Sequence, residues 1–260
     1  MVATLLREIP LQGGDVTDGV VRVGDTVRRP SSTSTPSVHA LLRHLEAAGF
    51  DGAPRVVGMD GAGRQILTYV PGTTGLRLES VSDGALAELA VLLRRYHDAT
   101  AGFPLSAKGW EGGSNDDKSP EVIGHCDLTP ENVIFRNGSP VAVIDFDLAR
   151  PTTRLFDIVT TLRHWAPLAD PLDRHPLLRS LDVGARLRLF CDAYGVPSRD
   201  RRRLLELARV RFQRSYTVMR TRATTGGNWA KMWAGGAGER IRRAAAWLDV
   251  HEDELHAHLV

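Results

Sequence analysis

Short apolar runs separated by polar turns fill the first seventy residues and predict a small β-sheet. The first run opens at Leu11, and the others cover residues 20–23, 26–29, 55–59 and 64–70. Turns rich in Gly and Asp, such as residues 60–63, separate them as hairpin turns do. Between the third and fourth runs, apolar residues recur at helical spacing, in a helix that we expect Ser37 to cap and Gly49 to stop. This part of the chain therefore predicts five strands and one helix.

The apolar pattern becomes mainly helical beyond Pro71-Gly72, which we interpret as a crossover between two lobes. Leu86, Leu89 and Leu93 share one helix face, so a helix is expected from Ser82 to near Gly102. Further helices are expected from about Leu155 to the end, interrupted by prolines at 167, 171, 176 and 197. The predicted fold is α+β, with a β-sheet lobe at 1–70 and a larger, mainly helical lobe at 71–260.

One hairpin interrupts the helical half. Residues 133–135 and 141–144 are β-branched or apolar runs, and Asn137-Gly138 lies between them. Such a pair between two runs is a strong hairpin signal. The turn folds the chain back, so we expect Asn132, before the first strand, to lie beside Asp145, after the second.

The polar residues around this hairpin have the types that phosphoryl transfer requires. That reaction needs a carboxylate beside the attacking hydroxyl, with an amide oxygen and a second carboxylate to hold Mg²⁺ on the nucleotide phosphates. Asp127, Asn132 and Asp145 supply these groups in order. Taken singly, each is most simply a turn or cap residue. Together, and with the hairpin between them, they favour a catalytic site.

The segments HCDLTPENVIF (125–135) and IDFD (144–147) resemble the catalytic and metal loops of kinase-like phosphotransferases, which include protein kinases and the aminoglycoside phosphotransferase family. The resemblance implies that Asp127 is the catalytic base and that Asn132 and Asp145 bind Mg²⁺. It assigns His125 and Asp157 to structural support of the catalytic loop. Asp147 is expected to be either a further metal contact or a strand-end residue.

The resemblance also predicts a site for ATP or GTP in the first lobe. The backbone of Thr68, Tyr69 and Val70 would meet the adenine edge, and Gly13 and Gly14 would lie over the phosphates. No lysine precedes Lys108, so Arg28 is expected to replace the usual phosphate-binding lysine, with Arg29 on the opposite strand face.

The first helix lacks the glutamate that would hold this cation, because Val38 or His39 falls at its place. A catalytically weak or inactive kinase-like binding or immunity module therefore stays open as an alternative.

The acceptor is expected to be a small molecule with a hydroxyl group. Asp157 follows Asp147 too closely for a peptide-binding activation segment. An aminoglycoside-type antibiotic, a sugar or another metabolite all remain open. Nine arginines between Arg199 and Arg222 predict a basic helix, most simply a solvated face. If that helix faces the cleft, a neutral or anionic acceptor is favoured over a polycation.

Composition predicts an ordinary cytoplasmic enzyme. The chain has 260 residues, and 42% hydrophobic with 25% charged residues is the composition of a globular protein. Its net charge of +2 gives no argument for nucleic acid, and no apolar stretch predicts a membrane span or signal peptide. Cys126 and Cys191 give no disulfide framework. A His125–Cys126 thiol pair is disfavoured, because adjacent side chains in an extended segment point to opposite sides.

Overall fold

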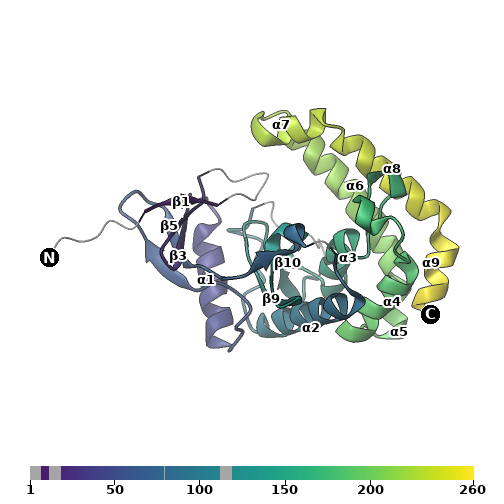
Figure 1. The fold of residues 1–260 in the computed structure, drawn as a ribbon, viewed down its shortest axis with the longest axis horizontal. Coiled ribbons are helices and arrows are strands. Elements are labelled where there is room, and N and C mark those ends of the chain that lie inside the picture. Colours follow the sequence, from purple (N-terminus) through teal and green to yellow (C-terminus); the bar gives the residue numbers. More distant parts are fainter. Residues whose placement is uncertain (1–6, 12–18, 79, 112–118) are drawn as a thin grey trace.

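The chain folds into two unequal lobes in a computed structural model that describes residues 7–11, 19–78, 80–111 and 119–260. The amino-terminal lobe holds an antiparallel sheet and one helix, and the carboxyl-terminal lobe is mainly helical (Figure 1). The predicted α+β two-lobed architecture is confirmed. The predicted residues Gly13 and Gly14 lie outside the described residues.

The small lobe contains a five-stranded antiparallel sheet in the order β1-β2-β3-β5-β4. Its strands are β1 (Ile9–Pro10), β2 (Val21–Val23), β3 (Thr26–Arg29), β4 (Val56–Met59) and β5 (Gln65–Thr68). Helix α1 (Thr35–Ala47) turns Leu41, Leu42 and Leu45 into the core, where they are fully buried. The predicted five strands and one helix are therefore present.

The start of α1 differs from the prediction. Ser34 is the N-cap residue, and Ser37 lies within the first turn of the helix. Pro36 explains the shift, because proline fits the first turn, where its missing N–H needs no partner. The helix ends as expected, with Gly49 at a φ of 75°.

The crossover between the lobes is held tightly to the predicted hairpin. Short strand β6 (Thr73–Thr74) pairs with β8 (Val133–Arg136), which pairs in turn with β9 (Ser139–Val143). Gly72 precedes β6 with a φ of 148°, and a Cβ there would lie 2.4 Å from Cγ2 of Ile134. No side chain fits at this position.

The large lobe is built around α2 (Asp83–Ala99), which Ser82 caps as predicted by accepting a hydrogen bond from the Ala85 amide at 3.1 Å. Strands β7 (Val122–Gly124) and β10 (Arg150–Thr152) form a second ribbon. The other helices are α3 (Arg154–Trp165), α4 (Val183–Tyr194), α5 (Ser198–Arg201), α6 (Leu204–Ala223), α7 (Gly227–Ala234), α8 (Ala237–Val250) and α9 (Glu252–Leu259). As expected, Pro171 and Pro176 begin 3₁₀ turns, and Pro197 precedes α5.

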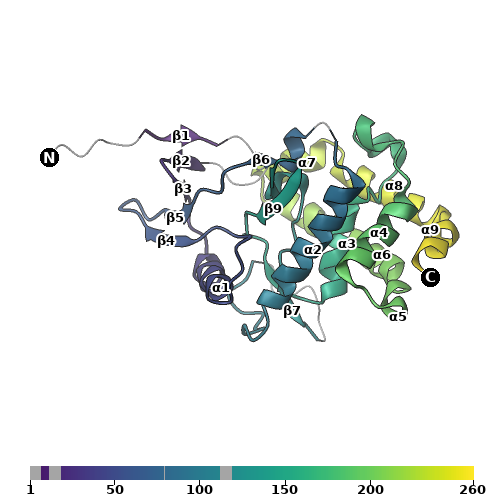
Figure 2. The same ribbon diagram turned by 60° about the horizontal axis from the view of Figure 1, so that its bottom comes forward.

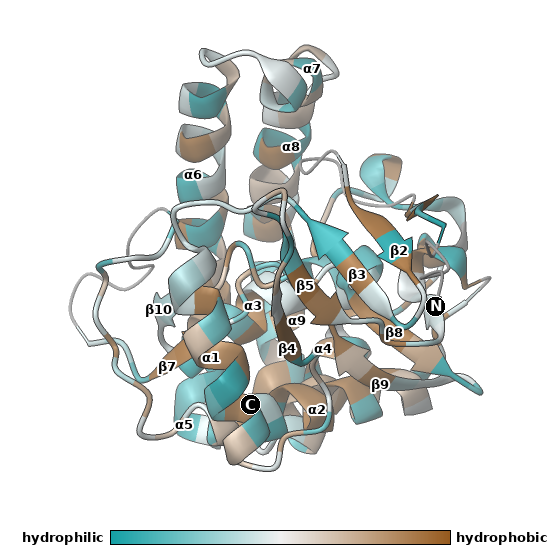
Figure 3. Cartoon of the chain, turned by 90° about the vertical axis from the view of Figure 1, so that its left-hand side faces the viewer, coloured by the Kyte–Doolittle hydropathy of each residue, from teal (hydrophilic) through white to brown (hydrophobic). Residues whose placement is uncertain are grey.

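Helices α6 and α8 lie side by side and project from the body, with α7 joining them at the outer end (Figures 1 and 3). Helix α6 also packs along α3 (Figure 2). The arginine-rich helix α6 therefore lies against α3, the helix that follows Asp145 and Asp147 in the chain. Within the described part of the chain, no helix is both long and apolar enough to cross a bilayer.

Candidate active site

The hairpin brings Asn132 and Asp145 together as the sequence predicts. Val133 pairs with Val143, and the Ile144 amide donates to the Asn132 carbonyl at 2.9 Å. Asn137 and Gly138 have φ angles of 52° and 84°, the two positive values that a type I′ turn requires. The two predicted metal residues therefore lie at the open end of one hairpin.

Asn132 also contacts Asp127, the predicted base. Its Nδ2 donates to the Asp127 carbonyl at 2.9 Å and to Oδ2 of the Asp127 carboxylate at 3.1 Å. Burial raises the pKa of the Asp127 carboxyl, the charge of Asp145 adds to the rise, and His125, Arg211 and the bond from Asn132 oppose it. A carboxylate with a raised pKa is a better proton acceptor, as a general base requires.

Asp157 supports the loop of residues 125–132 from behind. Its fully buried carboxylate accepts from the amides of His125 and Cys126, at 2.9 and 2.8 Å, and lies 2.9 Å from Nε2 of His97. Burial acts to raise the pKa of Asp157, but the hydrogen bond from His97 and nearby positive charge outweigh it and hold the pKa below its usual range. These contacts fit the predicted support role, which His125 shares by bonding the Ile144 carbonyl at 2.9 Å.

Two residues at the site adopt the left-handed backbone conformation that side chains rarely allow. Cys126 has a φ of 61° and Asp145 a φ of 63°. Such conformations cost about 1–3 kcal/mol each and concentrate at functional sites. The Cys126 side chain is buried, with 3% of its surface exposed.

Arg29, and not Arg28, reaches the metal-loop carboxylates. Its Nη2 lies 3.1 Å from Oδ1 of Asp145 and 2.5 Å from Oδ2 of Asp147. Arg28 points to the other sheet face, where it lies 3.5 Å from Asp60. The two side chains alternate across strand β3 as predicted, but with their assigned places reversed.

Arg29 has carboxylate partners in the large lobe in place of a glutamate on α1. The Arg29 side chain is buried, and burial would lower its pKa, but the charges of Asp145 and Asp147 outweigh burial and raise it. His39 of α1, at the place of the glutamate, instead bonds Gln65 at 3.2 Å. Arg29 is therefore paired across the two lobes and not with α1.

Thr68, Tyr69 and Val70 lie at the junction of the lobes. The Tyr69 amide donates to the Asp25 carbonyl at 2.8 Å, and the Thr68 hydroxyl accepts from the Arg55 amide at 2.8 Å. Arg22 stacks on the Tyr69 ring, 3.8 Å from its centroid. Among the described residues, the main chain of Val70 makes no hydrogen bond.

The oxygen atoms at the end of the hairpin suit Mg²⁺. Asn132 uses its Nδ2 toward Asp127, which leaves Oδ1 to accept, and the carboxylates of Asp145 and Asp147 lie together on Arg29. Mg²⁺ is usually held by one or two carboxylates together with substrate phosphates. This donor set is compatible with the predicted ion.

An arginine of helix α6, Arg211, adds positive charge near Asp127. Arg211 of α6 donates through Nε to Oγ1 of Thr160 on α3, at 3.2 Å. Burial, with the like charges of Arg163 and Arg150, lowers the pKa of Arg211 to about 9, whereas the charge of Asp127 raises it. The basic helix is thus not only a solvated face, since Arg211 is directed inward.

Three residues to which the sequence assigned no support role complete the support of the loop. His97 of α2 connects Asp157 to the Tyr194 hydroxyl, 2.7 Å from Nδ1. A Cβ at Gly124 would lie 2.9 Å from Cγ of Asp157, so glycine leaves room for that carboxylate. Trp165 is buried and donates to the Leu128 carbonyl at 2.7 Å, so it supports the end of the loop. No local motif identifies them, because their partners are distant in sequence.

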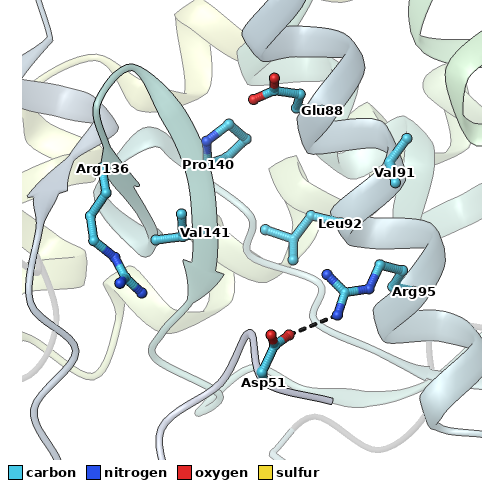
Figure 4. Close-up of a pocket in the computed structure, with 8 residues that line it drawn as sticks. All are labelled: Asp51, Glu88, Val91, Leu92, Arg95, Arg136, Pro140 and Val141. Carbon is cyan, nitrogen blue, oxygen red and sulfur yellow. Dashed lines mark hydrogen bonds and ion pairs between the residues drawn. The ribbon is translucent and has the colours of Figure 1, made fainter. Parts of the chain in front are cut away.

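A surface hollow of about 350 Å³ lies away from these residues, between α2 and the β8–β9 hairpin (Figure 4). Asp51 and Arg95 form a 2.7 Å ion pair at its edge. It contains none of the predicted site residues and is not the candidate active site.

The chain belongs to the phosphotransferase enzyme family, whose model matches residues 111–205, the segment that carries Asp127, Asn132, Asp145 and Asp157. It is similar to the trifolitoxin immunity protein of Rhizobium leguminosarum bv. trifolii, with 37% identity over 201 residues, which cover 75% of this chain and 76% of the relative.

Solved kinases share the fold. An amicoumacin kinase in complex with AMP-PNP, Ca²⁺ and Ami has a TM-score of 0.62 at 12% identity, covering 94% of this chain and 88% of that one. A choline/ethanolamine kinase family protein from Mesorhizobium loti has a TM-score of 0.63 at 17% identity, with 96% and 92% covered. The GDP complex of an aminoglycoside 2′-phosphotransferase has a TM-score of 0.54 at 15% identity, with 100% and 95% covered.

Proposed function

We propose that this protein transfers the γ-phosphoryl group of ATP or GTP to a hydroxyl of a small molecule. The observation that carries the proposal is the convergence of Asp127, Asn132 and Asp145 at one end of the β8–β9 hairpin. Asp127 orients the acceptor hydroxyl and accepts its proton. Asn132 and Asp145 hold Mg²⁺, which when bound neutralises charge on the phosphates. Residues 1–70 bind the nucleotide, and residues 71–260 supply catalysis and the acceptor site.

Arg29 has two roles in this proposal. In the structure it neutralises Asp145 and Asp147 from the small lobe. With nucleotide bound, its guanidinium turns to the phosphate oxygens, for which its planar fork is well suited. Val70 offers its main chain to the purine edge.

A second function, an immunity module that binds without catalysis, is favoured by one observation. The relative at 37% identity is an immunity protein. In the described small lobe, Arg29 also lacks a carboxylate partner from α1. Such a module would bind its ligand without phosphorylating it.

The decisive experiment measures nucleotide use before any acceptor is known. Purified protein should melt at a higher temperature with Mg·ATP or Mg·GTP, and should hydrolyse one of them slowly to the diphosphate. A mass-spectrometric screen of hydroxylated metabolites and antibiotics, trifolitoxin included, then seeks a product heavier by one phosphoryl group. Absence of both hydrolysis and any nucleotide-dependent shift rejects the enzyme. If nucleotide raises the melting temperature but no phosphorylated product forms, and if the Asp127→Asn variant still protects cells from the compound, the protein is a binding module.

A further inference from the structure

Two arginines lie on the side of the large lobe where α3 and α6 pack, one helical turn or more along α3 from Asp157, and their charges act on Asp127. Asp157, Thr160 and Arg163 follow one another at three-residue steps along a ridge of α3. Arg211 of α6 reaches this ridge through its 3.2 Å bond to Thr160. Arg163 lies over Phe212, the neighbour of Arg211, 5.9 Å from the ring centroid. Both guanidinium groups are thus fixed next to the support of the catalytic loop.

Neither arginine is neutralised by a described carboxylate at ion-pair distance. Other arginines nearby are paired: Arg209 lies 2.6 Å from both Asp249 and Glu252, and Arg222 lies 2.8 Å from Glu111. For Arg163, burial and the charge of Arg240 lower the pKa, and Asp127 is the acid that opposes them. Asp127 also raises the pKa of Arg211, as does the neighbouring Cys126 thiol.

The partly buried positive charge of Arg163 and Arg211 favours anionic ligands over cationic ones. Burying a cation without a partner is costly, and a bound oxyanion removes that cost. A polycationic acceptor would meet like charge at this place. The Arg fork binds carboxylate and phosphate oxygens with two parallel hydrogen bonds.

We infer that the acceptor carries an oxyanion, a carboxylate or a phosphate, which Arg163 and Arg211 bind while its hydroxyl lies at Asp127. This assignment rests on the proposed phosphotransfer and specifies its substrate class. It separates the acceptor from polycationic aminoglycosides.

The test uses a matched set of three-carbon hydroxyl compounds as probes. Glycerate carries a carboxylate, glycerol 3-phosphate a phosphate, glyceramide no charge and serinol an amine. Titration calorimetry on the nucleotide-free protein should show that at least one of the two anions binds more tightly than glyceramide. Serinol and kanamycin should not bind this site. The tighter of the two anions identifies the oxyanion.

Arginine variants connect this preference to the two residues. Arg163→Gln and Arg211→Gln should each weaken anion binding about 10-fold or more, because a hydrogen bond to a charged group is lost. Arg211→Lys, which keeps the charge but not the fork, should fall between. Arg220→Gln is the matched control, since Arg220 lies on the same helix but is exposed. Melting temperatures measured in parallel show that each variant is folded.

Three results would overturn the inference: equal affinity for the anions and glyceramide, tighter binding of serinol or kanamycin, or the same loss in Arg220→Gln as in Arg211→Gln. The Mg·nucleotide melting shift, recorded on the same samples, tests phosphotransfer separately. If both the nucleotide shift and hydrolysis are absent while anion binding is selective, the enzyme is rejected and the anion site is kept. A nucleotide shift without anion selectivity rejects the anion site and keeps the phosphotransfer proposal.

Discussion

Two aspartates on opposite sides of the 125–132 loop have opposite environments. Asp157, behind the loop, is surrounded by two amides and His97, which outweigh burial and lower its pKa. Asp127, in front, accepts one hydrogen bond from a described side chain, that of Asn132, and burial raises its pKa. The carboxylate that holds the loop has its oxygens occupied by donors. The carboxylate of Asp127, which we propose as the general base, has fewer donors and can accept a proton.

The largest effect should come from the front aspartate. Asp127→Asn removes the proton acceptor without changing shape, so turnover should fall by about 10²–10⁴-fold. The Mg·nucleotide melting shift should stay. Steady-state hydrolysis or transfer rates measure the change, and an unaltered rate would exclude Asp127 as the base.

The metal-loop carboxylates should come next. Asp145→Ala should reduce Mg²⁺-dependent nucleotide binding below what calorimetry detects, because Mg²⁺ has few protein ligands to lose. Asp147→Ala should cost less, since Asp147 lies two residues beyond Asp145 and so further from Asn132. Titrations with Mg·ATP and Mg·GTP compare them. Equal losses would mean that both carboxylates share the ion.

The rear aspartate should affect stability more than chemistry. Asp157→Asn should lower the free energy of unfolding by about 3–5 kcal/mol, because the buried contact with His97 loses its charge. Asp98→Asn, which breaks exposed pairs with Arg94 and Arg154, should cost about 1 kcal/mol or less. Urea unfolding compares the two variants.

The pH dependence of this loss has a definite sign. Because the folded pKa of Asp157 is lowered, its contribution is complete above the unfolded value of about 3.9 and disappears as pH falls through the folded pKa. The difference between wild type and Asp157→Asn should therefore shrink in acid. A constant difference would show that ionisation of Asp157 is not the source.

A smaller effect should separate the two arginines of β3. Arg29→Gln should weaken Mg·nucleotide binding about 10-fold or more, as expected for a lost hydrogen bond to a charged group. Arg28→Gln should change it little, since its partner is Asp60 on the other sheet face. Calorimetry decides between them, and the reverse order would restore the assignment to Arg28.

The smallest effect should be at Cys126. Cys126→Ala keeps the left-handed backbone position and removes a buried thiol, so most of the turnover should remain. The measurement is the same rate assay as for Asp127→Asn. A loss as large as that of Asp127→Asn in a folded variant would revive the thiol hypothesis.

Local signals in the sequence were sufficient for the fold and the hairpin. Asn137-Gly138 and the runs on either side determine the pairing that joins Asn132 to Asp145. Apolar spacing also predicted α2 and its Ser82 cap. The start of α1 was misplaced because Pro36 moves the cap to Ser34.

Features that depend on distant contacts could not be predicted. Alternation along β3 places Arg28 and Arg29 on opposite faces, but only the packing of the lobes decides which face meets Asp145. The same holds for His97, which lies sixty residues from Asp157 in the chain. Arg211 belongs to a run of arginines, and only the packing of α6 on α3 decides which of them contacts Thr160.

The tight fit of Gly72 has a mechanical consequence. Because β6 is paired to β8 and no side chain separates Gly72 from Ile134, the chain leaving the small lobe is anchored to the hairpin before it enters the large lobe. The small lobe is anchored to the same hairpin at a second point, because the Gly52 carbonyl accepts from the Val143 amide at 2.9 Å. The hairpin thus joins the two lobes at two places, and the Arg29–Asp145 pair spans them at its open end. Spectroscopic labels on β3 and at the open end of the hairpin would follow any change in that separation.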